Sequence, residues 1–172
     1  MSRVLIVYES MFGNTRRIAE AVAEGLGDAV EVVEVGSAPT LLPEDVDLLV
    51  VGAPTHAFGL SRPSTRESAA GQAVDDVVST GIGVREWLDE LRHGPAPVTA
   101  CAFDTRVKVG ILPGSAARKA LRRLGKLGFP ALVKAESFFV GGTPGPLLDG
   151  EVRRAREWGE SLAAARRSTT ST

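Results

Sequence analysis

One short run of residues has the side chains best suited to binding a small anion, because it is rich in hydroxyl and amide groups. The run consists of Ser10, Met11, Phe12, Gly13, Asn14 and Thr15. It follows the apolar residues Val4–Tyr8 and precedes an amphipathic segment. A loop that joins a strand to a helix can aim several backbone N–H groups at one anion, and the helix dipole favours negative charge there. Because the run contains no Lys or Arg, we predict a site for a phosphate monoester held mainly by neutral donors.

The same run has a second interpretation, a capped helix start that binds nothing, because Ser, Asn and Thr are good helix caps. Other nucleotide signatures are missing from the sequence, which has neither G-x-G-x-x-G after the first apolar run nor G-x-x-x-x-G-K-[ST]. A phosphoacceptor receiver domain would need an aspartate where this chain has Ala53-Pro54. The single cysteine, Cys101, and two distant histidines give no support for a metal site.

Apolar runs alternate with amphipathic segments along the whole chain. The runs predict strands at Val4–Tyr8, Val30–Val35, Leu48–Val51, Val98–Phe103 and Ala131–Val140. Helical spacing begins at Thr15, near Val84, at Ser115 and near Asp149, and the polar stretch Ser68–Gly83 is expected to be a surface excursion. Strands without polar alternation are covered on both faces, as in parallel sheets. We therefore predict a three-layer, doubly wound α/β fold, a five-stranded parallel sheet in the order 2-1-3-4-5, with the run at 10–15 where the strand order reverses.

Length and charge limit the remaining choices. The chain has 172 residues, which suits one domain at 1–165, followed by a polar tail at 166–172 that we expect to be disordered. The net charge of −1 argues against bulk attraction to nucleic acid or to a membrane surface. Nothing at the N-terminus is typical of a signal peptide, and no stretch is apolar enough to span a bilayer. We expect a cytoplasmic protein without nucleic-acid binding or membrane insertion.

A second loop gives the sequence a resemblance to a known family. Residues 52–59 read Gly-Ala-Pro-Thr-His-Ala-Phe-Gly after the third apolar run. This resembles the G-x-P-T-x-x-x-G loop near the flavin ring in the flavodoxin family and in flavodoxin-like quinone reductases. The run at 10–15 is similar to that family's T-x-T-G-x-T loop, although Phe12 replaces a hydroxyl. Residues Pro54–Arg66 look like an actinobacterial group of this family, and the resemblance extends from Val4 to about Leu162 by element order.

The resemblance implies a non-covalent FMN site built from three loops. Its predicted cofactor-binding residues are Ser10, Met11, Phe12, Gly13, Asn14, Thr15, Pro54, Thr55, His56, Ala57, Phe58, Phe103, Asp104, Thr105 and Arg106. Flavodoxins usually stack a tyrosine from the third loop on the ring, whereas the only tyrosine here, Tyr8, lies in the first strand. Phe103 could substitute for it, or it could be a core residue at a strand end.

Three functions remain open from the sequence. The first is an FMN-binding flavodoxin-like electron-transfer protein that works between a reductase donor and an acceptor enzyme. The second is an FMN-dependent NAD(P)H:quinone or flavin oxidoreductase, or a protoporphyrinogen oxidase of the same fold. The third is a binding module that kept the fold and lost the flavin. His56 could hydrogen-bond the flavin or donate a proton to a substrate, or it could be an ordinary loop residue.

One segment of the chain is strongly basic. Between Arg106 and Lys126 there are seven basic residues and no acidic ones, and Arg62 and Arg66 are expected to extend this into a basic rim beside the second loop. A solvated helix face is one interpretation. The other is attraction of an acidic redox partner or of an anionic nicotinamide dinucleotide. The family is usually acidic around the flavin, so this chain departs from the pattern.

Overall fold

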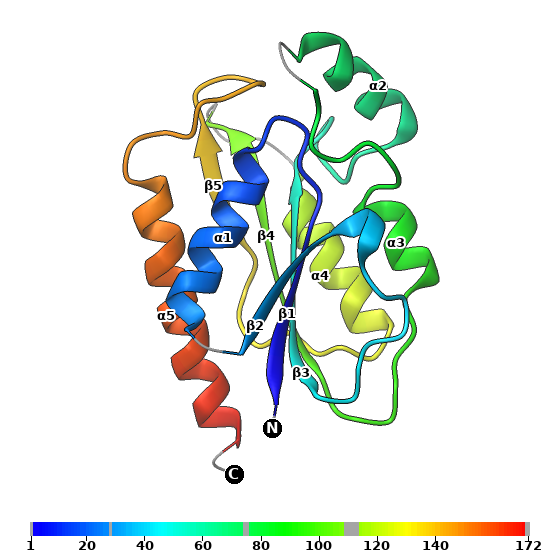
Figure 1. Cartoon of the computed structure of the whole chain (residues 1–172), viewed down its shortest axis with the longest axis vertical. Helices are drawn as coiled ribbons and strands as arrows, with labels where there is room; N and C mark the ends of the chain where they lie inside the picture. Colours follow the sequence, from blue (N-terminus) through cyan, green and yellow to red (C-terminus); the bar gives the residue numbers. More distant parts are fainter. Residues whose placement is uncertain (1, 28, 74–75, 109–113, 171–172) are drawn as a thin grey trace.

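A sheet of five parallel strands forms the centre of the computed structural model, which describes residues 2–27, 29–73, 76–108 and 114–170 (Figure 1). The strands are β1 (Arg3–Tyr8), β2 (Val30–Glu34), β3 (Val46–Pro54), β4 (Thr99–Val107) and β5 (Glu136–Val140). Their order is β2-β1-β3-β4-β5, which confirms the predicted 2-1-3-4-5 topology. The strand order therefore reverses beside β1, and the loop after β1 lies at that point.

Helices cover both faces of the sheet. α1 (Asn14–Leu26) and α5 (Glu151–Thr170) pack together on one face, and α3 (Val84–Glu90) and α4 (Ala116–Lys126) pack on the other. A short 3₁₀ turn, η1 (Val35–Ser37), follows β2. α2 (Pro63–Gln72) stands apart from both layers, at the carboxyl end of the sheet, as Figure 1 shows. Among the described residues, no helix is long and apolar enough to cross a membrane.

The core lies in two halves, one on each face of the sheet. In β1, Val4 and Ile6 pack in the cluster beneath α1 and α5, whereas Leu5 and Val7 pack in the cluster beneath α3 and α4. Successive side chains of a strand point to opposite faces, so a strand buried on both sides has no polar alternation. This explains the continuous apolar run from which the sequence analysis predicted β1.

Two glycines allow α1 and α5 to approach closely. A β-carbon added to Gly25 of α1 would lie 2.0 Å from the carbonyl oxygen of Arg156. One added to Gly159 of α5 would lie 2.3 Å from the carbonyl oxygen of Val22. Any larger residue at these positions would have to separate the two backbones. The position of α1, and of the loop that leads into it, therefore depends on α5.

The fifth strand is shorter than predicted. Ala131 forms only an isolated bridge with Ala100, and regular pairing resumes where Glu136 faces Phe103. From Ala100 to Phe103 β4 advances by three residues, whereas the opposite segment advances by five, from Ala131 to Glu136. The opposite segment therefore leaves the sheet between Ala131 and Glu136. The prediction that a strand runs continuously from Ala131 to Val140 is wrong for residues 132–135.

The C-terminal segment is helical where a disordered tail was expected. α5 continues to Thr170 because no Gly or Pro follows Gly159 and because Arg166 forms an ion pair with Asp47 at 2.8 Å. The hydroxyls of Ser168 and Thr169 also donate to carbonyls four residues earlier. The expectation of disorder is therefore wrong for residues 166–170, and residues 171–172 lie outside the described part.

Candidate functional site

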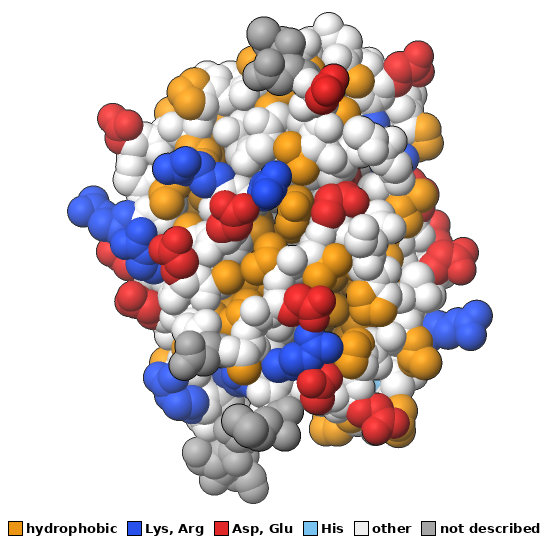
Figure 2. Space-filling view, viewed as in Figure 1, with side chains coloured by type: hydrophobic (Ala, Val, Ile, Leu, Met, Phe, Trp, Pro, Cys, Tyr) orange, Lys and Arg blue, Asp and Glu red, His pale blue; other side chains and the backbone are white. Residues whose placement is uncertain are grey.

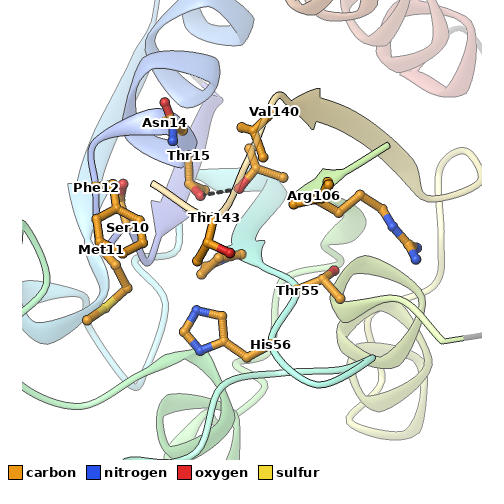
Figure 3. Close-up of a pocket in the computed structure, with 13 residues that line it drawn as sticks. Ser10, Met11, Phe12, Asn14, Thr15, Thr55, His56, Arg106, Val140 and Thr143 are labelled. Carbon is orange, nitrogen blue, oxygen red and sulfur yellow. Dashed lines mark hydrogen bonds between the residues drawn. The ribbon is translucent and has the colours of Figure 1, made fainter. Parts of the chain in front are cut away.

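A pocket opens at the carboxyl edge of the sheet, beside β1. It encloses about 460 Å³ of space, part of it open to solvent. Its lining comes from the loop after β1, the end of β3, the end of β4 and the segment after β5 (Figure 3). The lining residues are Ser10, Met11, Phe12, Asn14, Thr15, Pro54, Thr55, His56, Thr105, Arg106, Val107, Val140 and Thr143.

The loop at 10–15 is shaped by Gly13. Gly13 has φ of +92°, a left-handed conformation that residues with a β-carbon rarely adopt. Its N–H donates to Oγ of Ser10 at 3.0 Å, and its carbonyl accepts the first N–H of the α1 ladder, from Arg17, at 3.0 Å. The Ser10 hydroxyl therefore holds the loop itself, and its own hydrogen has no acceptor among the described residues.

Backbone donors converge at the start of α1. The N–H groups of Asn14, Thr15 and Arg16 have no hydrogen-bond acceptor in the described part of the chain. The first N–H groups of a helix lack partners within the helix, and the helix dipole places partial positive charge beside them. Two of these residues, Asn14 and Thr15, also line the pocket. Such an arrangement suits the oxygens of a phosphate group.

A pair of hydroxyls connects this end of the pocket to β4. Oγ1 of Thr15 lies 2.7 Å from Oγ1 of Thr105, and both side chains are buried. Whichever oxygen accepts the hydrogen of the other keeps its own hydrogen to donate. The pair therefore supplies one further neutral donor to the pocket (Figure 3, dashed line).

The second loop is fixed by hydrogen bonds at its first residue. The N–H of Thr55 donates to the carbonyl of Thr105 at 3.0 Å, and Oγ1 of Thr55 accepts from the N–H of Ala116 at 3.1 Å. Ala116 is the first residue of α4, so Thr55 ties the pocket wall to the start of that helix. The loop position is thereby set by β4 and α4 together.

A tight turn follows. His56 and Gly59 exchange both backbone hydrogen bonds, at 2.8 and 2.9 Å. The two residues between them, Ala57 and Phe58, have φ of +45° and +68°. Turns of this kind strongly prefer Asn or Gly at both central positions, and a residue with a β-carbon there is strained by about 1–2 kcal/mol. The Phe58 side chain is 51% exposed and does not line the pocket.

Comparisons with known proteins agree with this geometry. A model of the flavodoxin domain family matches residues 5–64, which include most of β1, all of β3 and both loops. Flavodoxin 1 from Bacillus cereus superposes with a TM-score of 0.66 at 17% identity, covering 95% of this chain and 98% of that one. A WrbA-like flavodoxin from Agrobacterium tumefaciens gives 0.58 at 21% identity, with 97% and 99% covered.

The likeness to solved flavodoxins shows a flavodoxin-like fold, and the family model matches residues 5–64 of the 172. Several proteins named NAD(P)H dehydrogenase (quinone) are similar to part of the chain. The one from Gluconacetobacter diazotrophicus is 33% identical over 85 residues, which cover 49% of this chain and 40% of that protein. The one from Bradyrhizobium sp. strain BTAi1 is 44% identical over 46 residues, covering 27% and 23%. The matched part of this chain thus spans less than half the length of these relatives.

The prediction of a third loop at 103–106 is wrong, because all four residues lie in a strand. β4 extends to Val107, so Phe103, Asp104, Thr105 and Arg106 are strand residues that alternate between the two faces of the sheet. Thr105 and Arg106 line the pocket. Arg106 donates from Nη1 to the carbonyl of Gly114 at 2.9 Å, so its guanidinium is held at the pocket edge.

Phe103 and Asp104 lie outside the pocket. Phe103 is fully buried and makes edge-to-face contacts with the rings of Phe138 and Trp158, both at 6.0 Å between centroids. Its interpretation as a core residue is confirmed, and a stacking role on a flavin ring is not available to it. The Asp104 carboxylate is also buried, accepting from the hydroxyl of Ser115 and from the N–H of Ala117 at the start of α4.

Of the fifteen predicted site residues, ten line the pocket: Ser10, Met11, Phe12, Asn14, Thr15, Pro54, Thr55, His56, Thr105 and Arg106. Gly13 shapes the loop without lining the pocket, and Ala57 and Phe58 form the adjacent turn. Sequence reasoning missed Val107, Val140 and Thr143. The sequence could have indicated Val140 and Thr143, because Val140 ends β5 at the same edge of the sheet and Thr143 follows it. Asn14 also reaches this segment, donating from Nδ2 to the carbonyl of Pro144 at 3.3 Å.

His56 presents a neutral ring to the pocket (Figure 3). Burial, together with the nearby charge of Arg66, lowers the pKa of His56 below its ordinary value. Oγ1 of Thr65 lies 3.1 Å from Nδ1 of His56 and already donates to the carbonyl of Arg62. Nδ1 is then the donor to Thr65, which leaves Nε2 as an acceptor. This arrangement favours hydrogen bonding over proton donation at neutral pH.

A buried acidic residue anchors the segments that flank the pocket. Glu9 has no exposed surface, and its carboxylate accepts from the hydroxyl of Ser61 and from the N–H of Val84 at 2.8 Å. Arg66 donates to the Ser61 hydroxyl at 2.8 Å and pairs with Glu86 at 2.7 Å. Burial raises the pKa of Glu9. Arg66 therefore connects α2 to α3 through these contacts. The expectation that it belongs to a basic rim is wrong.

Within the described ranges, no cluster of three or more His, Cys, Asp or Glu side chains could hold a metal ion.

Proposed function

We propose that this chain is an FMN-binding, flavodoxin-like electron-transfer protein. The observation that carries the proposal is the set of unpartnered N–H groups at Asn14, Thr15 and Arg16, which lie beside a pocket at the reversal of strand order. A monophosphate needs several convergent donors, and the protein provides them without a charged side chain in the loop. When bound, FMN supplies the electron-accepting and electron-donating chemistry, and the protein supplies binding and electrostatics.

The residues present fit a ligand with one polar and one flatter, less polar end. The amides of α1, the Ser10 hydroxyl and the Thr15–Thr105 pair would hold the phosphate. Pro54, Val107 and Val140 give the rest of the pocket an apolar lining, and Nε2 of His56 supplies an acceptor within it. Phe12 lines the pocket from the first loop, but in the described part of the lining no aromatic side chain comes from β4, where the third-loop tyrosine of flavodoxins is expected. Stacking on such a residue disfavours the electron-rich reduced flavin, so we expect a less negative potential here.

Its partners, under this proposal, are redox proteins that deliver and accept electrons, or NAD(P)H. A cytoplasmic location is part of the proposal, because NAD(P)H-linked donors operate there.

A second function, an FMN-dependent NAD(P)H:quinone oxidoreductase, is favoured by one observation. The relatives from Gluconacetobacter and Bradyrhizobium carry that name, although they match only part of their length. The two functions differ in their response to NADPH. Rapid bleaching of the bound flavin by NADPH alone, with turnover of a quinone, would favour the enzyme. Reduction only through a separate reductase would favour the carrier.

Titration with two flavins tests the proposal. Riboflavin has the flavin ring of FMN without the phosphate, so we expect FMN to bind at least about 100-fold more tightly if several charge-assisted hydrogen bonds form. Thr15→Val should weaken FMN binding by about tenfold and leave riboflavin binding unchanged, because a bond to a charged group contributes about 1.5–3 kcal/mol. Thr99→Val, at the far end of β4, is the matched control. Equal affinities for the two flavins, or no binding of either, would contradict the proposal.

A further inference from the structure

The exposed side of α4 carries uncompensated positive charge. Arg118, Lys119, Arg122 and Lys126 are exposed, and none of them forms an ion pair with any described residue. Arg123 differs, because it pairs with Asp89 of α3. Residues four apart lie on the same side of a helix, so Arg118, Arg122 and Lys126 form a row about 12 Å long. We call Arg118, Lys119, Arg122 and Lys126 together the basic row.

Phe58 lies next to the start of this row. A β-carbon at Gly114 would lie 2.2 Å from the carbonyl oxygen of Phe58 and 3.0 Å from its Cβ, so the turn packs directly on the approach to α4. A β-carbon at Gly59 would lie 2.6 Å from Nζ of Lys119, which places that ammonium group beside the turn. The turn that carries the half-exposed Phe58 therefore lies beside Lys119, at the start of the basic row.

This surface has two features that its own fold does not require. Phe58 exposes about half of an apolar side chain to water, and it does so from a left-handed backbone conformation that strains the turn. Strained positions that persist are frequently found at functional sites. Protein interfaces commonly combine an aromatic side chain that becomes buried with a polar or charged rim, and Arg and aromatic residues dominate their binding energy.

We propose that Phe58 and the basic row form the docking face for an acidic protein that exchanges electrons with this chain. The proposal rests on the proposed flavin function and names the partner of that site. Thr55 belongs to the pocket lining and bonds to the first N–H of α4, so a protein on this face would sit beside the pocket opening. Electrons could then pass between the two proteins over a short path.

A protein fits this face better than a long polyanion or a membrane. The basic row has four positive charges over about 12 Å, whereas the whole chain has a net charge of −1. On the face turned to the viewer in Figure 2, acidic and basic side chains are interspersed. Extended polyanions are bound by many phosphate contacts, and charged lipid surfaces by larger clusters of basic residues. A compact acidic patch beside an apolar pocket matches the size and charge of this face.

The rate of electron transfer gives the first test. The probe is a reduced, acidic plant-type [2Fe–2S] ferredoxin, whose cluster is oxidised by one electron as the oxidised FMN-loaded protein is reduced by one. Arg118→Glu with Arg122→Glu should lower the second-order rate constant at least tenfold at about 0.01 M ionic strength, and the difference should shrink at about 0.5 M. The control, Lys134→Glu with Arg153→Glu, makes the same change in net charge at exposed positions away from α4, and its rate should stay close to that of the wild type.

Binding to the apoprotein separates this proposal from the flavin function. We expect oxidised ferredoxin to bind the full-length apoprotein, with Phe58→Ala about tenfold weaker and Phe58→Leu intermediate. If FMN does not bind, the proposed function fails, and the apoprotein measurement still tests the docking face. If FMN binds but the α4 and control variants behave alike, the docking face is overturned. Failure of the wild type to bind ferredoxin, or preferential binding of duplex DNA or phosphatidylserine vesicles at 0.15 M salt, would also overturn it.

Discussion

At the scale of single residues, Gly13 has the most direct effect on the site. Its left-handed backbone turns the chain from β1 into α1 and directs its N–H to Ser10, which brings the first N–H groups of the helix together. The space around it is open, with no atom within 4 Å of an added β-carbon. The requirement for glycine here is therefore conformational and not steric.

We expect Gly13→Ala to lower the free energy of unfolding by about 1–2 kcal/mol, the cost of placing a β-carbon in the left-handed region. FMN binding should weaken as well, because the loop would relax away from this conformation. Urea unfolding and flavin titration measure the two effects. Gly71→Ala is the control, since Gly71 lies within α2 with equally open space and no positive φ. Its stability should be unchanged or higher by up to about 1 kcal/mol.

Glu9 should leave a signature in the pH dependence of stability. Its pKa in the folded protein is raised above its ordinary value of 4.5, so the folded state binds more protons than the unfolded state between the two values. Stability then falls as pH rises through that interval. The free energy of unfolding of the wild type, minus that of Glu9→Gln, should decrease from pH 4.5 upward and level off above the raised pKa. A difference that rises with pH would contradict this.

Some residue roles could be predicted from the sequence and others could not. The residue types at 10–15 identify a loop with neutral donors, because their chemistry does not depend on distant contacts. The role of Phe103 depends on how far β4 extends, and that is decided by pairing with β5. Glu9 gave no signal at all, since its partners Ser61 and Val84 lie 52 and 75 positions away.

At the scale of elements, the α1–α5 contact controls the placement of the phosphate loop. Backbone atoms of the two helices approach so closely at Gly25 and Gly159 that each position has space only for glycine. We expect Gly25→Ala to destabilise the protein by about 1–3 kcal/mol, because the helices must move apart. Thermal or urea unfolding measures this change. Gly125→Ala in α4, where nothing lies within 4 Å, should be neutral or stabilising. Similar effects in the two variants would exclude tight packing as the cause.

The elements that the sequence predicted well are those with a continuous apolar face. β1 and β3 are buried on both sides, so their composition alone identified them. α2 escaped prediction because its sequence has almost no apolar stripe, and Ala69 is its only buried residue. It depends on Pro63 at its start, on the Thr65 hydroxyl that accepts from the N–H of Arg62, and on the ion pair between Arg66 and Glu86. Such long-range polar contacts leave no periodic pattern.

At the scale of the whole molecule, bound cofactor should contribute substantially to stability. A ligand that binds only the folded state stabilises it by about 2.7 kcal/mol at 100 times its dissociation constant. For a domain of this size we expect saturating FMN to raise the melting temperature by about 5–10 °C. Riboflavin at the same concentration should have a much smaller effect. A differential scanning measurement with each flavin checks this, and an equal shift for both would count against the phosphate site.

Thr105 contacts both ends of the pocket. Its side-chain oxygen touches Thr15 at the start of α1, and its carbonyl accepts from Thr55 at the start of the second loop. The spacing between those two loops is thus set by a single residue of β4, which bonds to one loop through its side chain and to the other through its backbone. A mononucleotide of the right length can span both ends at once, whereas a shorter or longer molecule must give up one of them. We therefore expect selectivity for ligand length to depend on β4.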